Sequence, residues 1–395
     1  MKILLFDNSH LPTIGGKEIV VHHLATQYQR LGHEVLVGGP GSYFAHRKVE
    51  LGYPLRRFPN LPLVSFERSW KWRASQLLSS GRLGSGKFDL VHAHTTYPCA
   101  FYAAQAFRDG VPAVPLIVTP HGADIHKLPE IQFGKRLDPV LDEKICWSLT
   151  QCARATSISQ GIRDSLVDAG MDEAKIVDIP NGVDIDRFGQ QVELDARSEL
   201  GLAETTKLLV TIGNAHPRKG HETLVEAVVE CSKRRDDLHL VIIGHGLDEL
   251  QQKITAAGHS QLVTIAGGLP FPVPGQTNPP DLLAALLQQS TAYISSSVGE
   301  GSEGLSLALL ESMAAGTCIV ATAVSGTKDI IRHEQNGLLV VPGSVEDMSA
   351  AIDRVCSDPS YRDALRRESK SDSNGYSWNA IARKYIGLFE ELLAV

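Results

Sequence analysis

Short, uninterrupted apolar segments recur along the whole chain, and each is followed by a longer segment with helical periodicity. Runs of this length suit parallel strands that are covered on both faces, and strands that alternate with helices predict doubly wound α/β sheets. In the first half of the chain we expect strands at Ile3–Phe6, Val35–Val37, Leu90–Ala93, Leu116–Thr119, Ala155–Ile158 and Ile176–Ile179. In the second half we expect them at Leu208–Ile212, Leu240–Ile243, Val263–Ala266, Tyr293–Ser295, Cys318–Ala321 and Leu338–Val341.

The two series of strands predict two domains, which suits a chain of 395 residues. The turn signal of Pro180-Asn181-Gly182 separates the series. We therefore place an N-terminal domain at residues 1–182 and a C-terminal domain at residues 183–375. Residues 376–395 carry an apolar stripe at helical spacing, which indicates a last helix that docks on another surface.

Composition narrows the class of protein. The net charge of −7 argues against a nucleic-acid partner, whose binding protein would carry a basic surface. Six scattered cysteines without a CxxC pair are typical of buried free thiols in a reducing compartment. No apolar run has transmembrane length and the N-terminus lacks a signal-peptide pattern, so we expect a cytoplasmic protein.

The stretch from Ser295 to Glu311 is the strongest candidate for a functional site. A strand runs into a Ser/Gly-rich loop, and the loop opens a helix that we predict over Gly304–Ala315, with Gly316 ending it. Free N–H groups at such a helix start attract phosphate. Glu303 and Glu311 would lie ~12 Å apart along the helix axis, about the length of a nucleoside diphosphate sugar from sugar to ribose. The alternative is a pair of solvated carboxylates.

Three other strand-to-helix loops carry candidate residues. Gly15-Gly16 lies in a loop that is not a GxGxxG fingerprint, so NAD binding is disfavoured, and a tight turn competes with close approach of a phosphate or acceptor. His121 follows a strand and could be an active-site donor or a hydrogen-bonded loop residue. Arg218 and Lys219 are placed where fixed cations would hold a diphosphate, although adjacent Arg and Lys are often only surface residues.

Two further features have open interpretations. His92 and His94 could form a zinc pair, but no carboxylates accompany them in the sequence. Residues 46–87 combine basic side chains with interleaved Phe and Trp, a pattern that suits contact with anionic lipid head groups or, alternatively, a solvated loop with ordinary core aromatics. The proline-rich loop Leu269–Pro280 is longer than a turn requires.

Taken together, the motifs of the chain resemble those of glycosyltransferase family 4. The likeness spans nearly the whole length and includes these segments: Gly15-Gly16 with Leu31-Gly32-His33-Glu34-Val35, Asp89-Leu90-Val91-His92, His121-Gly122-Ala123-Asp124, Pro180-Asn181-Gly182-Val183-Asp184 with Phe188, Gly213 to Lys219-Gly220, and Glu303-Gly304 to Glu311-Ser312-Met313-Ala314. The two Glu separated by seven residues resemble the signature of that family. The resemblance implies a GT-B fold, in which two Rossmann-like doubly wound domains face each other across a cleft.

The resemblance also implies roles for the matching residues. His121, Glu303 and Lys219 would be catalytic, with Lys219 on the diphosphate and His121 near the reacting carbon of the sugar. Glu311 would hold the ribose. The remaining donor-binding positions would be Gly16, Arg218, Gly304, Leu305 and Ser306, with Asp124, His216 and Asn214 as further candidates.

One position departs from the family pattern. Asn214 stands directly after Gly213, where the family usually has Arg, so Arg218 or His216 would have to replace that phosphate contact. Ser325-Gly326 replaces the glycine pair that is usual near this position.

The resemblance implies a retaining glycosyltransferase that moves a sugar from a nucleoside diphosphate sugar to a hydroxyl of a glycan or lipid-linked glycan. UDP-sugar is the first expectation for the donor and GDP-mannose the second. The N-terminal domain would bind the acceptor, the C-terminal domain would bind the nucleotide sugar, and the last helix would pack back on the N-terminal domain. We expect no cofactor and no metal ion, and peripheral membrane contact through residues 46–87 at the inner face of the membrane. The alternatives are a non-catalytic nucleotide-sugar-binding subunit, which Asn214 favours, and a nucleotide-sugar epimerase on the same fold.

Overall fold

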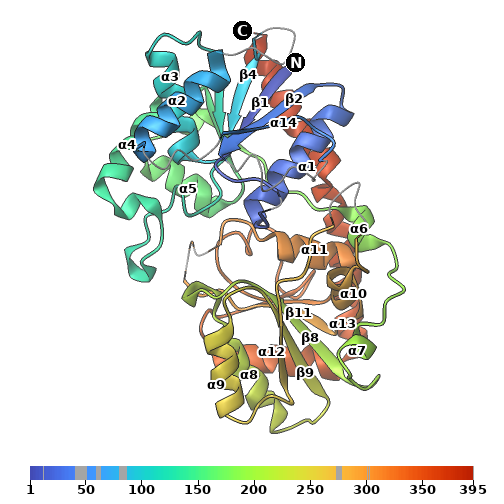
Figure 1. The fold of residues 1–395 in the computed structure, drawn as a ribbon. Helices are drawn as coiled ribbons and strands as arrows, with labels where there is room; N and C mark the ends of the chain where they lie inside the picture. Colours follow the sequence, from blue (N-terminus) through green and yellow to red (C-terminus); the bar gives the residue numbers. More distant parts are fainter. Residues whose placement is uncertain are drawn as a thin grey trace. The chain divides into compact units, whose positions relative to one another are not determined.

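The computed structural model contains two parallel sheets, each in its own unit of the chain (Figure 1). It describes residues 1–11, 13–40, 51–58, 64–79, 87–272, 278–299, 301 and 303–394. The N-terminal unit comprises Met1–Asn181 and Trp378–Val395, and the C-terminal unit comprises Gly182–Pro272 and Thr277–Ser377. The predicted fold class, two doubly wound α/β sheets, is confirmed.

The sheet of the N-terminal unit has the order β3-β2-β1-β4-β5-β6-β7, and all its pairs are parallel. Its strands are β1 (Lys2–Phe6), β2 (Glu34–Pro40), β3 (Leu55–Phe58), β4 (Leu90–Ala93), β5 (Leu116–Val118), β6 (Arg154–Ser157) and β7 (Ile176–Asp178). β3 was absent from the predicted strands because its sequence, Leu-Arg-Arg-Phe, contains no apolar run. As the last strand in the order it is hydrogen-bonded along one side, where polar residues are tolerated.

The helices of this unit contact one another as well as the sheet. They are α1 (Gly16–Arg30), α2 (Phe66–Ser79), α3 (Phe101–Arg108), α4 (Pro139–Thr150), α5 (Gln160–Asp168) and α14 (Trp378–Leu393). The apolar stripe of α14 packs against α1, with the ring of Tyr385 edge-on to Tyr28. The Tyr385 hydroxyl lies 3.3 Å from the hydroxyls of Thr119 and Thr156. α14 is thereby part of the core of the N-terminal unit, although it is the last element of the chain.

The sheet of the C-terminal unit has the order β10-β9-β8-β11-β12-β13. Its strands are β8 (Lys207–Ile212), β9 (Leu238–Ile243), β10 (Val263–Gly267), β11 (Ala292–Ser295), β12 (Ile319–Thr322) and β13 (Leu338–Val340). Its helices are α6 (Ile185–Gly189), α7 (Ala196–Glu199), α8 (His221–Ser232), α9 (Asp248–Ala256), α10 (Leu282–Gln289), α11 (Leu307–Ala315), α12 (Val345–Ser357) and α13 (Pro359–Ser373).

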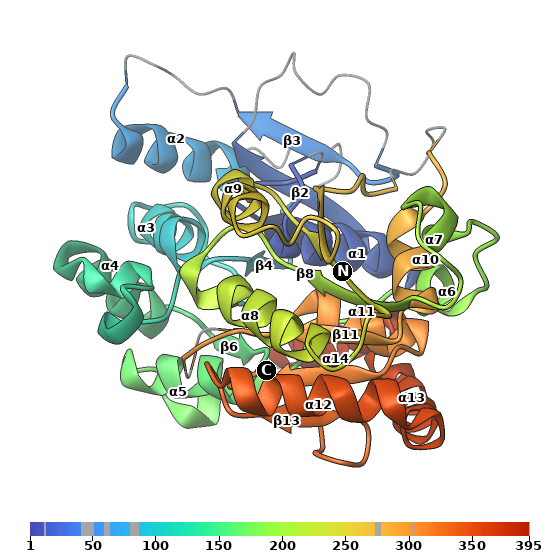
Figure 2. The ribbon, with the colours of Figure 1, turned by 90° about the horizontal axis from the view of Figure 1, so that it is seen from below.

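Helices cover both faces of this second sheet. Alternate residues of the strands, such as Leu209, Ile242 and Val320, form one core with α8, α9 and α12. α8 and α12 lie side by side on that face (Figure 2). α10 and α11 contact the strands from the opposite face and also contact each other. Burial on both faces explains the continuous apolar runs of the sequence.

The structure corrects one predicted element and part of one predicted surface. α11 begins at Leu307, with Ser306 as its N-cap, and not at Gly304. In the basic–aromatic segment, Phe58, Trp70 and Arg73 are buried and belong to the core, whereas Phe66 and Trp72 are exposed. Its residues 46–50, 59–63 and 80–86 lie outside the described part of the chain, as do 273–277 of the proline-rich loop.

The six cysteines are unbonded, and all except the half-buried Cys146 are buried. Among the described residues, no helix is both long and apolar enough to cross a bilayer.

Candidate functional site

Two neighbouring strands of the C-terminal unit place the central residues. β8 and β11 are paired and parallel, so the loops that leave their carboxyl ends lie at the same edge of the sheet. The loop after β8 carries Arg218 and Lys219 in a 3₁₀ turn (Pro217–Lys219), and the loop after β11 carries Ser297 and Glu303. Residues that are 84 positions apart in the sequence thereby come into contact.

The Glu303 carboxylate is the centre of this contact. Its Oε1 lies 2.5 Å from the Lys219 ammonium and 3.6 Å from Nη1 of Arg218. The Ser297 hydroxyl donates a hydrogen bond of 2.6 Å to the same oxygen. The Glu303 side chain is only 8% exposed, whereas those of Lys219 and Arg218 are 18% and 22% exposed. The two cations therefore still reach solvent while they hold the carboxylate.

Electrostatics keep Glu303 ionised. Burial alone raises the pKa of this carboxyl, but the charges of Lys219 and Arg218 and the hydrogen bonds from Lys219 and Ser297 outweigh burial, so the pKa lies below its ordinary value. A buried carboxylate beside two cations can accept hydrogen bonds from sugar hydroxyls. The cations can at the same time face a diphosphate.

Backbone contacts fix the two loops to each other. The Val298 N–H donates to the carbonyl of Arg218, and the Ser296 hydroxyl donates to the carbonyl of Lys219. Gly220 has φ +61°, and a Cβ atom there would lie 2.1 Å from the Ser296 carbonyl oxygen. Only glycine fits this close approach without strain.

The entrance to α11 supplies hydrogen-bond donors. The backbone N–H groups of Gly304 and Ser306 have no acceptor among the described residues. The Ser306 hydroxyl caps the helix by accepting from the Leu309 N–H. Unpaired N–H groups and the positive end of the helix make this point a favourable place for a phosphate. Because α11 begins at Leu307, Gly304, Leu305 and Ser306 precede the helix and do not form its first turn.

Gly326 and Ser325 contact the loop that precedes α11. A Cβ atom on Gly326 would lie 2.0 Å from the Gly304 carbonyl oxygen, and Gly326 has φ +80°. The Ser325 hydroxyl accepts a hydrogen bond from the Gly301 N–H. The serine that replaces the first glycine of the usual pair therefore has a structural partner here.

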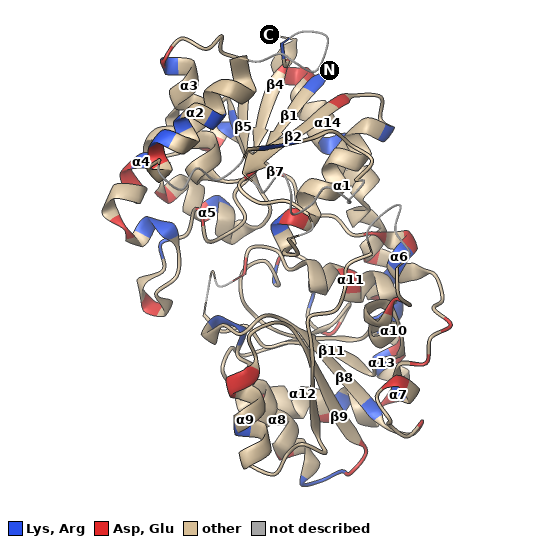
Figure 3. Ribbon diagram, viewed as in Figure 1, with Lys and Arg blue, Asp and Glu red and all other residues tan. Residues whose placement is uncertain are grey.

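Glu311 is the only charged residue of α11 (the red position on that helix in Figure 3). It is half-buried, and burial raises its pKa to about 7, with Asp281 and Asp184 adding to the increase and Arg187 opposing it. Arg187 is itself engaged with Asp281 through contacts of 2.7 and 3.2 Å. Glu311 has no hydrogen bond or ion pair within the described ranges, so its oxygens can accept a ligand hydroxyl.

Asn214 does not take the place of the arginine that the family pattern has there. Its side-chain oxygen accepts a hydrogen bond of 2.9 Å from the His245 N–H, and the Ala215 N–H donates to the His245 carbonyl. Asn214 thus ties the loop after β8 to the loop after β9. The ring of His216 caps the 3₁₀ turn by accepting from the Arg218 N–H at 3.3 Å. Of the two proposed replacements, Arg218 is the one that contacts Glu303.

In the N-terminal unit, Asp124 organises the loop that carries His121. One carboxylate oxygen accepts from the His121 N–H at 2.9 Å, and the other accepts from the Thr96 N–H at 2.8 Å. The His121 ring lies 3.2 Å, nitrogen to nitrogen, from the ring of His94. Burial lowers the pKa of His121 to about 3, with Lys17 and His92 acting in the same direction. His121 is therefore a neutral donor or acceptor, and His94 sets its tautomer.

His92 and His94, which the sequence left open as a zinc pair, have other partners in the structure. His92 bonds to the Thr119 hydroxyl at 2.7 Å, and His94 bonds to His121. Within the described ranges, no group of three or more potential metal ligands gathers.

Sequence reasoning missed an ion pair beside Gly16, at the start of α1. The Lys17 ammonium lies 2.5 Å from a carboxylate oxygen of Asp7 and 3.1 Å from one of Glu18. Burial raises the pKa of Asp7 to about 6 even though Lys17 opposes the shift. The position of Asp7 after the last residue of β1 was the available signal, because ligand residues gather at the carboxyl ends of parallel strands.

Comparisons with known proteins identify the class of enzyme to which the chain belongs. A family model described as Glycosyl transferases group 1 matches residues 193–372, and one described as Glycosyltransferase Family 4 matches residues 14–187. An uncharacterized glycosyltransferase of Methanocaldococcus jannaschii is 25% identical over 99% of this chain and 98% of its own. A D-inositol 3-phosphate glycosyltransferase of Frankia alni is 26% identical over 96% and 95% of the two chains. A phosphatidyl-myo-inositol mannosyltransferase of Mycobacterium tuberculosis is 27% identical over 78% and 75%.

Solved structures share the fold. The crystal structure of Anabaena Alr3699/HepE in complex with UDP and glucose superposes with a TM-score of 0.78 at 20% identity, covering 99% of this chain and 100% of that one. A sucrose-phosphate synthase from Thermosynechococcus elongatus gives a TM-score of 0.78 at 19% identity, covering 100% and 99%. These likenesses confirm the GT-B fold. With the two family models spanning most of its length, the chain belongs to glycosyltransferase family 4 and is a glycosyltransferase.

Proposed function

We propose that this enzyme transfers a sugar from a nucleoside diphosphate sugar to an acceptor hydroxyl, with retention of the anomeric configuration. The observation that carries the proposal is the Glu303 carboxylate with Lys219 and Arg218 against it, next to the unpaired N–H groups that precede α11. Carboxylate, cations and N–H donors are the groups that a sugar joined to a diphosphate requires.

The diphosphate would bind to Lys219, Arg218 and the N–H groups of Gly304 and Ser306. Charge develops on the leaving diphosphate as the sugar–oxygen bond breaks, and fixed cations and N–H donors stabilise that charge. Because Lys219 and Arg218 are held by Glu303 before the donor arrives, they need little rearrangement. Arg218 is proposed to supply the cation that Asn214 does not.

The two acidic residues would bind the sugar and the ribose of the donor. Glu303 would accept hydroxyls of the sugar, since it is ionised and adjacent to the phosphate-binding groups. Glu311 would accept the ribose hydroxyls, since it lies further along α11 and has no partner within the described part of the chain. Its pKa is raised to about 7, as is expected for a buried carboxyl that has no hydrogen-bond donor within the described part of the chain.

In the chemical step, the acceptor oxygen would attack the anomeric carbon on the face from which the diphosphate departs. The bond from carbon to the diphosphate oxygen breaks, the new glycosidic bond forms, and the acceptor proton moves to the departing diphosphate. No protein carboxylate has to act as a nucleophile in this scheme. The enzyme would contribute positioning and stabilisation of charge.

The N-terminal unit would supply His121 for the donor sugar and Gly16 for the diphosphate and acceptor. The neutral His121 ring, held by Asp124 and His94, can donate or accept a hydrogen bond without carrying charge. His121→Ala would lower activity, whereas His94→Ala would act only through the orientation of His121.

For the donor we propose a UDP-sugar first and GDP-mannose second, and for the acceptor a hydroxyl of a glycan or lipid-linked glycan. Within the basic–aromatic segment, α2 is the part that we propose contacts the membrane, because its Phe66 is 55% exposed and its Trp72 is 44% exposed. Sedimentation with anionic vesicles at low salt tests it. Binding that Trp72→Ala reduces supports the proposal, and no binding removes it.

A panel of UDP-, GDP- and ADP-sugars, each assayed for nucleotide release and sugar transfer, tests the reaction. One donor should be turned over by the wild type and by Lys233→Ala, which removes an exposed cation of the same unit. Lys219→Ala should lose most of that turnover. If no donor is transferred or hydrolysed, the proposed reaction is wrong.

A further inference from the structure

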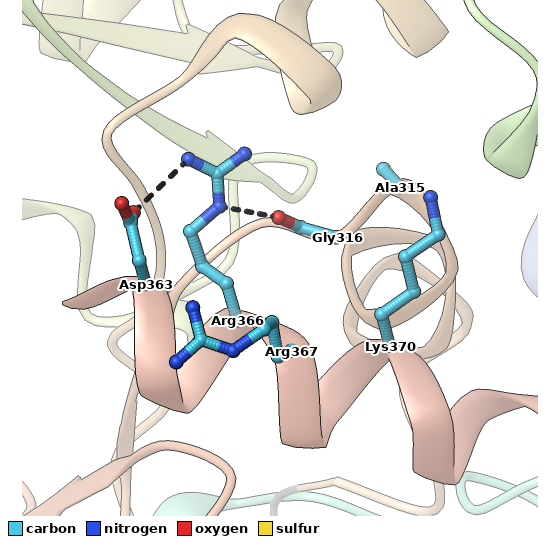
Figure 4. Close-up of a pocket in the computed structure, with 6 residues that line it drawn as sticks. All are labelled: Ala315, Gly316, Asp363, Arg366, Arg367 and Lys370. Carbon is cyan, nitrogen blue, oxygen red and sulfur yellow. Dashed lines mark hydrogen bonds and ion pairs between the residues drawn. The ribbon is translucent and has the colours of Figure 1, made fainter. Parts of the chain in front are cut away.

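A cavity of about 370 Å³ lies in the C-terminal unit, where α13 passes the end of α11 (Figure 4). Its lining consists of Ala315, Gly316, Asp363, Arg366, Arg367 and Lys370. Three cations and one carboxylate thus surround a space in which Ala315 offers the one apolar side chain. None of these residues has a role in the proposed reaction.

The cations are held in different ways. Arg366 donates from Nε to the Gly316 carbonyl at 2.6 Å, and its Nη1 lies 3.7 Å from Asp363. Figure 4 shows these two contacts as dashed lines. The stem of Lys370 lies against Gly316, where a Cβ atom would be 3.1 Å from it. The side chains of Arg367 and Lys370 have no ion pair or hydrogen bond within the described ranges, so their charges are available.

A second cavity of about 200 Å³ shares Arg366 with the first. It adds Arg197, Lys207 and Arg362 to the lining, with Glu204 as its carboxylate. Six cations and two carboxylates therefore line the two cavities, in a chain whose net charge is −7. A local excess of this size on an acidic protein favours an anionic ligand.

We propose that these two cavities form a binding site for a phosphate-bearing small molecule. Arginine side chains match phosphate oxygens in bidentate geometry, and lysine adds a mobile charge. The volume lies at the small end of the range of ligand sites, which suits a compact anion. The lining contains no aromatic side chain, and Ala315 is its one apolar residue with a side chain.

This site is separate from the proposed donor site. The proposed diphosphate-binding groups precede the first residue of α11 and the cavity lies at its last residue, and nine residues of helix span ~14 Å. A ligand in the cavity would lie against the helix that carries Glu311. The inference therefore goes beyond the proposed function and does not depend on it.

Calorimetric titration with inorganic pyrophosphate tests the inference on the full chain. The test variant combines Arg367→Ala with Lys370→Ala, two exposed side chains whose loss breaks no ion pair within the described residues. The control combines Arg30→Ala with Lys384→Ala, two exposed cations of the N-terminal unit. Lys219→Ala reports binding at the donor site. Melting temperatures close to that of the wild type establish that each variant is folded.

The inference predicts that the Arg367/Lys370 variant loses affinity for pyrophosphate at least tenfold. The control and Lys219→Ala should each retain a binding event within twofold of the wild-type affinity. Equal binding by the wild type and the Arg367/Lys370 variant would overturn the inference, as would an equal loss in the control. If Lys219→Ala alone abolishes binding, pyrophosphate occupies only the donor site, which contradicts this inference but supports the proposed function.

Discussion

The Lys219 ammonium and the Glu303 carboxylate lie 2.5 Å apart, although one follows β8 and the other follows β11. The pair joins the two loops at the edge of the sheet where ligands bind in this class of fold. It also leaves the ammonium partly exposed while the carboxylate is buried. This contact between a partly exposed cation and a buried anion is the basis of the proposed donor site.

Removing the Lys219 ammonium should cost both activity and stability. Lys219→Ala deletes a cation from the developing leaving-group charge, so kcat/KM should fall about 10²-fold or more. Glu303 keeps Arg218 and Ser297 as partners, so the free energy of unfolding should fall by only about 1–3 kcal/mol. Steady-state kinetics and chemical denaturation measure the two effects. Lys233→Ala, the matched control, should leave both within error.

The two acidic residues should separate in their kinetic effects. Glu303→Gln removes the charge that holds the cations in place and that is proposed to contact the sugar, so kcat should fall roughly 10²–10³-fold. Glu311→Gln weakens the proposed contact to the ribose, which does not change in the chemical step, so KM for the donor should rise roughly tenfold with kcat nearly unchanged. Kinetics with the donor that the panel identifies measure both variants. Similar kcat values for the two variants would contradict the assignment of roles.

Glu311 should make stability depend on pH. Its pKa is about 7 in the folded protein against 4.5 ordinarily, so the folded state binds more protons than the unfolded state between these values. The free energy of unfolding therefore loses the contribution of Glu311 as pH rises from about 4.5 through 7, by up to roughly 3 kcal/mol. Glu311→Gln should be more stable than the wild type at pH 8 and nearly equal to it at pH 5. Denaturation at both pH values measures the difference, and a constant difference would refute the shift.

Asn214 should act by positioning a loop. Asn214→Ala removes the acceptor of the His245 N–H and should raise KM for the donor several-fold, at a stability cost of about 1 kcal/mol. Asn214→Asp keeps an acceptor oxygen and should retain near wild-type kinetics. Kinetics of the two variants together separate a loop contact from a direct phosphate contact, because Asp would repel a phosphate strongly. A larger loss in Asn214→Asp than in Asn214→Ala would contradict the positioning role.

Gly220 should tolerate no side chain. Gly220→Ala places a Cβ atom 2.1 Å from the Ser296 carbonyl oxygen at φ +61°, so the two loops must separate. The free energy of unfolding should fall by about 2–4 kcal/mol, from backbone strain and overpacking together. Gly258→Ala is the matched control, since Gly258 has φ +77° with open space around it and should cost only about 1 kcal/mol. Equal losses would show that the close approach of the loops does not matter.

Much of the fold could be predicted from local pattern. Continuous apolar runs located the strands of both sheets to within a few residues, because strands covered on both faces need such runs. β3 escaped this reasoning because its two arginines interrupt the pattern in a strand that is paired along one side. The start of α11 was placed three residues early, because Gly304 and Leu305 fit a helical pattern while Ser306 is the residue that caps it.

The site was predictable only in part. The two loops with Glu303 and Lys219 could be named from the sequence, but their contact depends on β8 and β11 being neighbours, which no local pattern specifies. The same limit explains why Asp7 with Lys17, and His94 with His121, were not paired in advance. Which side chains of the basic–aromatic segment are exposed also depends on contacts with distant residues. Trp70 packs against Phe6 and Tyr102, whereas Trp72, two residues on, is exposed.

Binding of nucleoside diphosphates to the wild type and to Lys219→Ala, measured by calorimetry with UDP, GDP and ADP, tests the central claim most directly. The account predicts that one of the three binds the wild type and that Lys219→Ala binds that nucleotide at least tenfold more weakly, while Lys233→Ala binds it equally well. Equal affinity of the wild type and Lys219→Ala for every nucleotide that binds would contradict the claim that the contact of Lys219 and Glu303 forms the donor site.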